Sequence, residues 1–289
     1  MDYLDLFVRY ASLTGPNRKR AMQADFSALR TRLQAVLDAS FHERKQVKRL
    51  IHFAVPAQAL RVRAIEADGI RLTGSLSSLV GGEECTIITS DERMYIGTVR
   101  KCDAGLYVRV DEMVSTVEDI ADLGVQTGDW VEVNPNVLVT KSRFIKARNL
   151  RAISCFAIVI CVLRLLLEDK RTLARATEFC LCRDGEDSGC HENCDGFGGI
   201  CSPEDFEESI RIEALAITEE NNLDEYSVAI QGKVLEQIAK EKNIPYKAIQ
   251  GMGNENIMAV AFHVDGLSER GHEEGIRAAI TLLSAYLSE

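Results

Sequence analysis

Hydrophobic residues are concentrated most strongly at positions 153–167, where Arg164 is the one charged residue. A run that is apolar on all sides is typical of a helix buried inside a domain, and this one is too short to span a bilayer. The preceding residues 140–148, T-K-S-R-F-I-K-A-R, predict a strand that leaves a small β domain. Together the two stretches predict a strand, a tight corner and the central helix of an α/β domain.

Helical and alternating patterns predict the rest of this domain. Apolar residues recur at helical spacing over 3–13 and 26–39, which predicts an N-terminal helical layer with a turn at Gly15-Pro16-Asn17. Ser202-Pro203-Glu204-Asp205 has the residues of a capped helix start. A helix is also expected over 234–242 and another at the end of the chain. Strands are expected at 50–54, 57–64, 176–182, 210–217, 226–230 and 246–250.

The pattern changes to short strands separated by turns between residues 66 and 138. Strands are expected at 85–89, 94–100 and 106–110, and a one-turn helix at 116–121 would have Ser115 as N-cap and Glu118 three residues later. This segment predicts an inserted small β barrel or sandwich. The expected domains are therefore 1–65 and 139–289 for the two parts of the α/β domain and 66–138 for the insertion.

The net charge of the chain limits which classes of binding partner we expect. The 289 residues carry a formal net charge of −10, and no block of Lys and Arg is long enough to bind a phosphate backbone, so nucleic acid is not expected as a partner. No basic start or long apolar segment follows Met1, so neither a secretory signal nor a membrane contact is expected. We expect a cytoplasmic protein, in which nine cysteines indicate reduced thiols or a metal site before disulfides.

One polar segment gathers five of the cysteines with a histidine: Cys180, Cys182, Cys190, His191, Cys194 and Cys201. Thiolate and imidazole are ligands for zinc or an iron–sulfur cluster. The spacings C-x-C and C-x3-C do not reproduce the paired C-x2-C of strong metal motifs. Free thiols in a loop, with the first two cysteines as small buried residues of a strand, are the alternative.

The corner at residues 142–148, S-R-F-I-K-A-R, resembles that of the tetrahedral aminopeptidases, the dinuclear-zinc family that includes glutamyl and deblocking aminopeptidases. Segments in matching order extend the resemblance from about Val55 to Leu287: D-L-G-V-Q-T-G-D-W-V at 122–131, S-P-E-D at 202–205 and L-E-Q-I-A-K-E-K-N-I-P-Y at 235–246. The resemblance implies an aminopeptidase-like mixed sheet flanked by helices. It also implies that the inserted β domain carries subunit contacts.

The resemblance further implies where the family's zinc ligands would lie. The histidine and aspartate of the first strand correspond to Ala54 and Pro56, and the bridging aspartate corresponds to Arg151. A guanidinium has no acceptor atom and stays protonated, so it cannot bridge two cations. The adjacent glutamates are reduced to at most Glu186, and the final histidine corresponds to Gly266. A carboxylate remains at Glu213, where a strand glutamate is usually satisfied by a salt bridge.

These losses predict a pseudoenzyme with no catalytic residues and no cofactor. Its expected role is structural, in assembly or in binding, either as a homo-oligomer or with another protein subunit. No G-x-S-x-G, H-E-x-x-H or Walker motif offers another active site. Two alternatives remain open. One is a metal or iron–sulfur module at the cysteine segment; the other is a zinc aminopeptidase with displaced ligands, which requires His52, Glu186, Glu213 and either His263 or His272 to converge.

Overall fold

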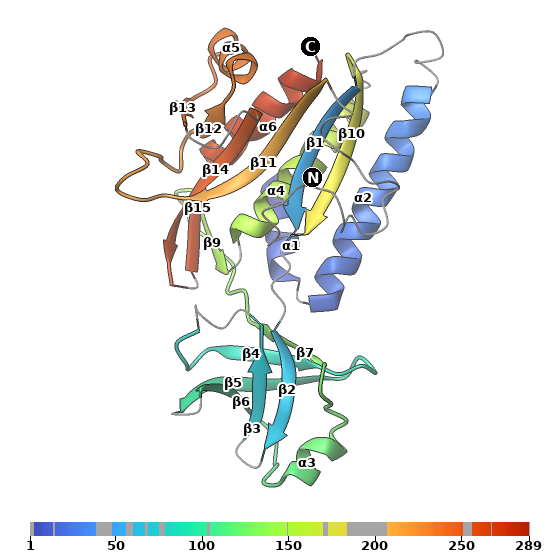
Figure 1. Ribbon diagram of the computed structural model, residues 1–289, viewed down its shortest axis with the longest axis vertical. Coiled ribbons are helices and arrows are strands. Elements are labelled where there is room, and N and C mark those ends of the chain that lie inside the picture. The colour runs from blue at the N-terminus through green and yellow to red at the C-terminus, as the bar shows by residue number, and fades with distance from the viewer. Residues whose placement is uncertain are drawn as a thin grey trace. The chain divides into compact units, whose positions relative to one another are not determined.

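The computed structural model describes residues 3–13, 15–38, 48–55, 60–66, 69–74, 79–102, 105–148, 150–169, 173–183, 207–250, 256–266 and 268–288. The chain divides into two compact units (Figure 1). The first unit contains residues 1–11, 21–57 and 137–289, and the second contains 12–20 and 58–136. We describe each unit by itself.

A nine-stranded mixed sheet forms the centre of the first unit, as the sequence predicts. Four parallel strands lie side by side: β10 (Ala176–Arg183), β1 (Lys48–Val55), β11 (Glu208–Ala216) and β14 (Asn256–Asp265). The sheet continues antiparallel through β15 (Ser268–His272), β9 (Phe144–Arg148) and β8 (Leu138–Val139). Strands β12 (Val228–Gln231) and β13 (Tyr246–Ala248) extend it beside the first half of β14.

The helices that contribute to this unit are α1 (Tyr3–Ser12), α2 (Gly15–Asp38), α4 (Leu150–Glu168), α5 (Lys233–Glu241) and α6 (Glu273–Ser288), of which α2 belongs to it from residue 21 onward. Helix α4 packs against β1, β11, β14 and α6, which confirms the central buried helix. Its Phe156 meets the rings of Tyr10, Phe26 and Phe53, so α1 and α2 share this core. None of the described helices has the length and apolar character needed to cross a membrane.

One predicted turn near the start of the chain is wrong. Gly15-Pro16-Asn17 is the first turn of α2 and not the connection before it. Proline is accepted at this place because the first amide groups of a helix have no intrahelical partner. The predicted capped helix start at 202–205 lies outside the described residues.

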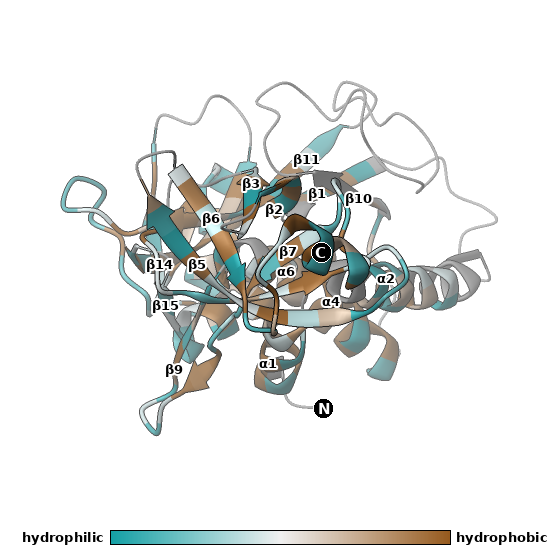
Figure 2. Ribbon diagram, turned by 90° about the horizontal axis from the view of Figure 1, so that it is seen from below, coloured by the Kyte–Doolittle hydropathy of each residue, from teal (hydrophilic) through white to brown (hydrophobic). Residues whose placement is uncertain are grey.

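The second unit is a closed six-stranded antiparallel barrel in the order β2-β3-β6-β5-β4-β7. Its elements are β2 (Leu60–Glu66), β3 (Gly69–Thr73), β4 (Glu84–Ile88), β5 (Met94–Cys102), β6 (Gly105–Val110), α3 (Val117–Asp122) and β7 (Trp130–Val133). Figure 2 shows hydrophobic and hydrophilic segments along both β5 and β6, as expected for strands with one face inside a barrel. Buried inside are Val62, Ile70, Ile87, Val99, Val108 and Val131.

The barrel differs from the sequence prediction in two details. It begins with β2 at Leu60, ahead of the boundary expected at residue 66. The cap of α3 is also displaced by one residue, since Thr116 is the N-cap and Asp119 completes the capping box, in place of Ser115 and Glu118. Both Ser115 and Thr116 have the side chain of an N-cap, so the spacing alone does not decide between them.

Candidate functional site

The positions matched to the zinc ligands lie near one edge of the parallel strands. Strands β1, β11 and β14 run in the same direction, so their carboxyl ends meet there, which is where α/β sheets bind ligands. Ala54 belongs to β1 and pairs in register with Cys182 of β10. Pro56 and Glu186 lie outside the described residues. The structure therefore describes the side-chain surroundings of Arg151 and Glu213 and the backbone of Gly266.

Arg151 lies in the first turn of α4, where Glu269 of β15 binds it twice. Its Nε donates to Glu269 Oε1 at 2.8 Å, and its backbone N–H donates to Oε2 at 2.7 Å. The Glu269 side chain is only 10% exposed, whereas that of Arg151 is 37% exposed. A carboxylate is favourable here because the first amides of a helix lack intrahelical partners and carry a partial positive charge. Glu269 is thus held by a cation and a helix terminus together.

Glu213 is paired with a cation on its own strand. Arg211 Nε lies 2.7 Å from Glu213 Oε1, and the two residues share a face of β11 because they are two positions apart. This confirms the salt bridge that the sequence favours for a lone strand glutamate. The carboxylate that remains among the described family positions is therefore already neutralised within the protein.

Gly266 forms the turn between β14 and β15. Asp265 is directly opposite Ser268, so Gly266 follows the last residue of β14 in the connection to β15. Gly266 has φ +59°, in the left-handed region, which favours glycine over residues with a Cβ atom. The backbone conformation accounts for a glycine where the resembled family has a ligand histidine, and glycine has no side chain to offer a metal.

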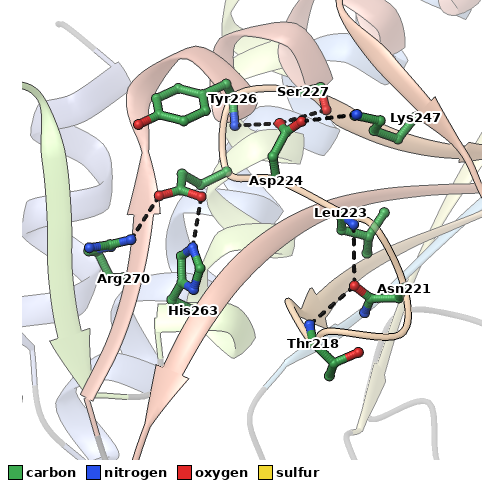
Figure 3. Close-up of polar contacts among 10 residues, drawn as sticks. Thr218, Asn221, Leu223, Asp224, Tyr226, Ser227, Lys247, His263 and Arg270 are labelled. Atoms are coloured by element: carbon green, nitrogen blue, oxygen red, sulfur yellow. Dashed lines mark hydrogen bonds and ion pairs between the residues drawn. The ribbon is translucent and has the colours of Figure 1, made fainter.

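The histidines considered as displaced ligands lie in separate surroundings. His263 Nε2 lies 2.9 Å from Glu225 Oε2, and Arg270 donates to the other oxygen of Glu225 at 2.9 Å (Figure 3). His272 Nε2 lies 2.9 Å from the carbonyl oxygen of Ser142. His52 pairs in register with Cys180 and Arg211, and its Nε2 is buried without a hydrogen-bond partner in the described part of the chain.

Glu225 was not singled out in the sequence. Its side chain is 7% exposed, and its carboxylate joins residues of β14 and β15 that lie about 40 positions further along the chain. Next to it, Asp224 accepts hydrogen bonds from the Ser227 hydroxyl and the Tyr226 backbone N–H. Burial opposes ionisation of Asp224, but these hydrogen bonds lower its pKa below the usual value. The sequence signal that could have indicated Glu225 is the acidic pair Asp224-Glu225 shortly before the buried strand β12.

Known proteins resemble the chain in fold and, more distantly, in sequence. No family model matches it. The candidate aminopeptidase YhfE of Bacillus subtilis is 28% identical over 232 residues, which is 69% of this chain and 65% of YhfE. The aminopeptidase APDkam598 of the archaeon Desulfurococcus kamchatkensis matches with a TM-score of 0.73 and 14% identity, covering 99% of this chain and 94% of its own.

A further solved structure is the TET1 peptidase of Pyrococcus horikoshii, described as assembling into a tetrahedron or a large octahedral shell. It matches with a TM-score of 0.64 and 12% identity over 85% of each chain. The chain is thus similar in fold to the TET aminopeptidases and distantly similar in sequence to YhfE. The mixed sheet with an inserted barrel is the TET aminopeptidase fold that the sequence led us to expect.

Three described residues that the sequence resemblance matches to zinc ligands do not have the chemistry of a dinuclear zinc centre. Arg151 brings a positive charge and no acceptor atom, Glu213 is paired with Arg211, and Gly266 has no side chain. Within the described ranges, no group of three or more His, Cys, Asp or Glu side chains is arranged to hold a metal ion. We therefore derive no metal-dependent reaction for this chain.

The cysteine segment is only partly described. Cys180 and Cys182 belong to β10, whereas Cys190, His191, Cys194 and Cys201 lie outside the described residues. Elsewhere, Cys85, Cys155 and Cys161 are buried, and Cys102 is partly exposed. Burial raises the pKa of the Cys85 thiol to about 12, with smaller contributions from Asp111, Glu84 and Glu83, so this thiol stays protonated inside the barrel.

Proposed function

We propose that this chain is a catalytically inactive relative of the TET aminopeptidases that has a structural, assembly or binding role. The observation that carries this proposal is the ion pair between Arg151 and Glu269, at the position matched to the bridging aspartate. In this pair the Glu269 carboxylate accepts hydrogen bonds from the backbone N–H and the guanidinium of Arg151, and the guanidinium balances its charge.

Electrostatics favours this arrangement over a metal centre. Two zinc ions bring four positive charges, which a dinuclear site balances with several carboxylates and imidazoles. Arg151 adds another positive charge, and freeing Glu269 for a metal would leave the guanidinium without its partner. The same pair attaches β15 to the start of α4, so it has a structural role.

The proposal is tested by metal content and peptidase activity of the full chain purified without chelator. We expect no stoichiometric zinc, and no hydrolysis of leucyl, alanyl or glutamyl p-nitroanilides with or without added zinc or cobalt. Arg151→Asp is also expected to remain inactive, because Ala54, Pro56 and Gly266 would still supply no ligand. Two metal ions per chain together with turnover would refute the proposal.

A single zinc or several irons per chain would instead favour the cysteine segment. In that case Cys190→Ser with Cys194→Ser should abolish metal binding, while Cys155→Ser in the buried helix α4 serves as the control. Such a result would replace the scaffold proposal with the metal-module alternative, because the bound metal would then have a defined protein site.

For the assembly role, we infer that the chain forms homo-oligomers through the barrel. The barrel exposes Met94, Ile96 and Met113, which are 56%, 55% and 102% exposed, and the first two share a face of β5. Exposed apolar side chains of this kind favour protein contacts. Light scattering after size exclusion should show an oligomer for the native chain and a smaller species for Met94→Glu with Ile96→Glu. Val234→Glu, at an exposed position of α5, is the control that should leave the mass unchanged.

A further inference from the structure

A row of basic side chains crosses the antiparallel part of the sheet. His263 of β14 is directly opposite Arg270 of β15, and Arg270 is directly opposite Lys146 of β9. Directly opposite residues of antiparallel strands project from the same face, with Cβ atoms about 5 Å apart. We call His263, Arg270 and Lys146 the basic row. On the far side of Lys146 the row ends at Leu138 of β8.

Glu225 neutralises only part of this row. Its two oxygens are engaged by His263 and Arg270 (Figure 3), while Lys146 has no ion pair with any residue in the described part of the chain. The neighbouring row pairs Arg148 with Ser268 and Ser268 with Asp265, so a further base and a carboxylate lie at its two ends on the same face. Like charges directly opposite one another destabilise a sheet. The pairing of Lys146 with Arg270 therefore has a cost in the free chain that an anionic ligand would remove.

The basic row is accessible and bordered by aromatic rings. The side chains of Arg270 and His263 are 38% and 45% exposed. The Arg270 guanidinium lies 4.9 Å from the centre of the Phe144 ring, which leaves it stacked and oriented. The rings of Phe144 and Tyr226 each lie 4.7 Å from that of His272. Cations held in fixed positions beside rings are well placed to bind carboxylates that arrive on an extended chain.

We propose that the basic row binds an acidic segment of a protein partner. The chain has a net charge of −10, so a cationic face is complementary to an acidic segment short enough to interact locally. A nucleic acid extends much further and would meet the repulsion of the remaining surface. The inference rests on the binding role proposed above and specifies it, but it does not depend on the chemistry of the family's zinc positions.

The test measures binding of a fluorescein-labelled hexaglutamate peptide to the full chain by fluorescence anisotropy at about 50 mM salt, where screening is modest. Hexaglutamine is the neutral probe. We expect the native chain to bind hexaglutamate and not hexaglutamine. Lys146→Glu should weaken binding about tenfold or more, because it reverses a charge within the row. Lys233→Glu has the same change of charge at an exposed position of α5 and should alter the affinity by less than about twofold.

Thermal unfolding of the same variants supplies a second readout. Lys146→Glu places a carboxylate opposite Arg270, so it should raise the Tm by about 2 °C while it weakens binding. Opposite effects on stability and affinity separate a binding role from a structural one. Equal loss of binding in both variants, or equal binding of hexaglutamine, would overturn the proposal. Tighter binding of a single-stranded oligonucleotide that Lys146→Glu abolishes would overturn the assignment to an acidic peptide. Absence of metal and peptidase activity has no bearing on these outcomes.

Discussion

Two ionic clusters in the α/β unit differ in whether their charges are paired and in how exposed their side chains are. At the start of β1, Arg49 donates to Glu208 Oε2 at 2.8 Å and to the carbonyl oxygen of Tyr286 at 2.7 Å. Its side chain is only 3% exposed and stacks on the Tyr286 ring. Arg175 and the Tyr286 hydroxyl complete the hydrogen bonds of the Glu208 carboxylate. At the basic row, the Glu225 carboxylate contacts both His263 and Arg270, and Lys146 has no ion pair in the described part of the chain.

The difference separates ionic groups that maintain the fold from those available for binding. A buried cation is tolerated where hydrogen bonds satisfy it, and removal of its partner is then costly. A partly exposed surplus of one charge contributes little to stability, because water and salt screen it. We therefore expect the two clusters to respond differently when a single carboxylate is removed.

The largest effect is expected for Glu208→Ala. This change leaves Arg49 buried with one carbonyl partner and no counter-charge, which should lower the free energy of unfolding by about 3 kcal/mol. Urea unfolding followed by circular dichroism measures it. Glu213→Ala removes a glutamate from the same strand, but its ion pair with Arg211 is more exposed, so the expected loss is below about 1 kcal/mol. Equal losses would contradict the distinction between buried and exposed pairs.

A smaller loss, about 2 kcal/mol, is expected for Glu225→Gln. The amide keeps the shape of the buried side chain but removes the negative charge between His263 and Arg270. The loss should increase as salt is lowered, since the basic row then contains only bases. In a Lys146→Glu background the same change should cost less, because the new carboxylate opposite Arg270 compensates in part. Urea unfolding of the native chain, the two single variants and the double variant measures this. Additive effects on the free energy of unfolding would show that the charge of Lys146 does not interact with the other residues of the row.

The buried cluster should also appear in the pH dependence of stability. Burial opposes ionisation of Glu208, but hydrogen bonds from Tyr286 and Arg49 and the charge of Arg175 outweigh it, so its pKa lies below the usual 4.5. The unfolded chain then binds the proton more readily, and the stabilisation is present above about pH 4.5 and lost as the pH falls through the folded-state pKa. Urea midpoints between about pH 6 and 3 should fall less steeply for Glu208→Gln than for the native chain. Parallel curves would exclude Glu208 as a contributor.

Local sequence patterns predict most of the helices and strands, whereas contacts between residues far apart in the sequence form the candidate site. The continuous apolar run of α4 identifies a buried helix, and the alternation in the barrel strands identifies a sheet with one buried face. The hairpin of β14 and β15 was not identified, because residues 257–262 are buried without alternation and only two residues separate the strands. Without that hairpin, neither Glu269 near Arg151 nor Glu225 near His263 could be placed. The first of these pairs joins residues 118 positions apart, a contact that no local pattern contains.

A smaller effect than those of Glu208 and Glu225 is expected at the N-cap of α3 in the barrel. Asp119 accepts from the backbone N–H groups of Ser115 and Thr116, which lower its pKa, and its own N–H donates to the Thr116 hydroxyl. Thr116→Ala should therefore lower the free energy of unfolding by about 1 kcal/mol, as loss of an N-cap does. Ser115→Ala keeps both halves of the capping box and should cost clearly less. The reverse order in urea unfolding would restore Ser115, the residue that the sequence favoured, as the cap.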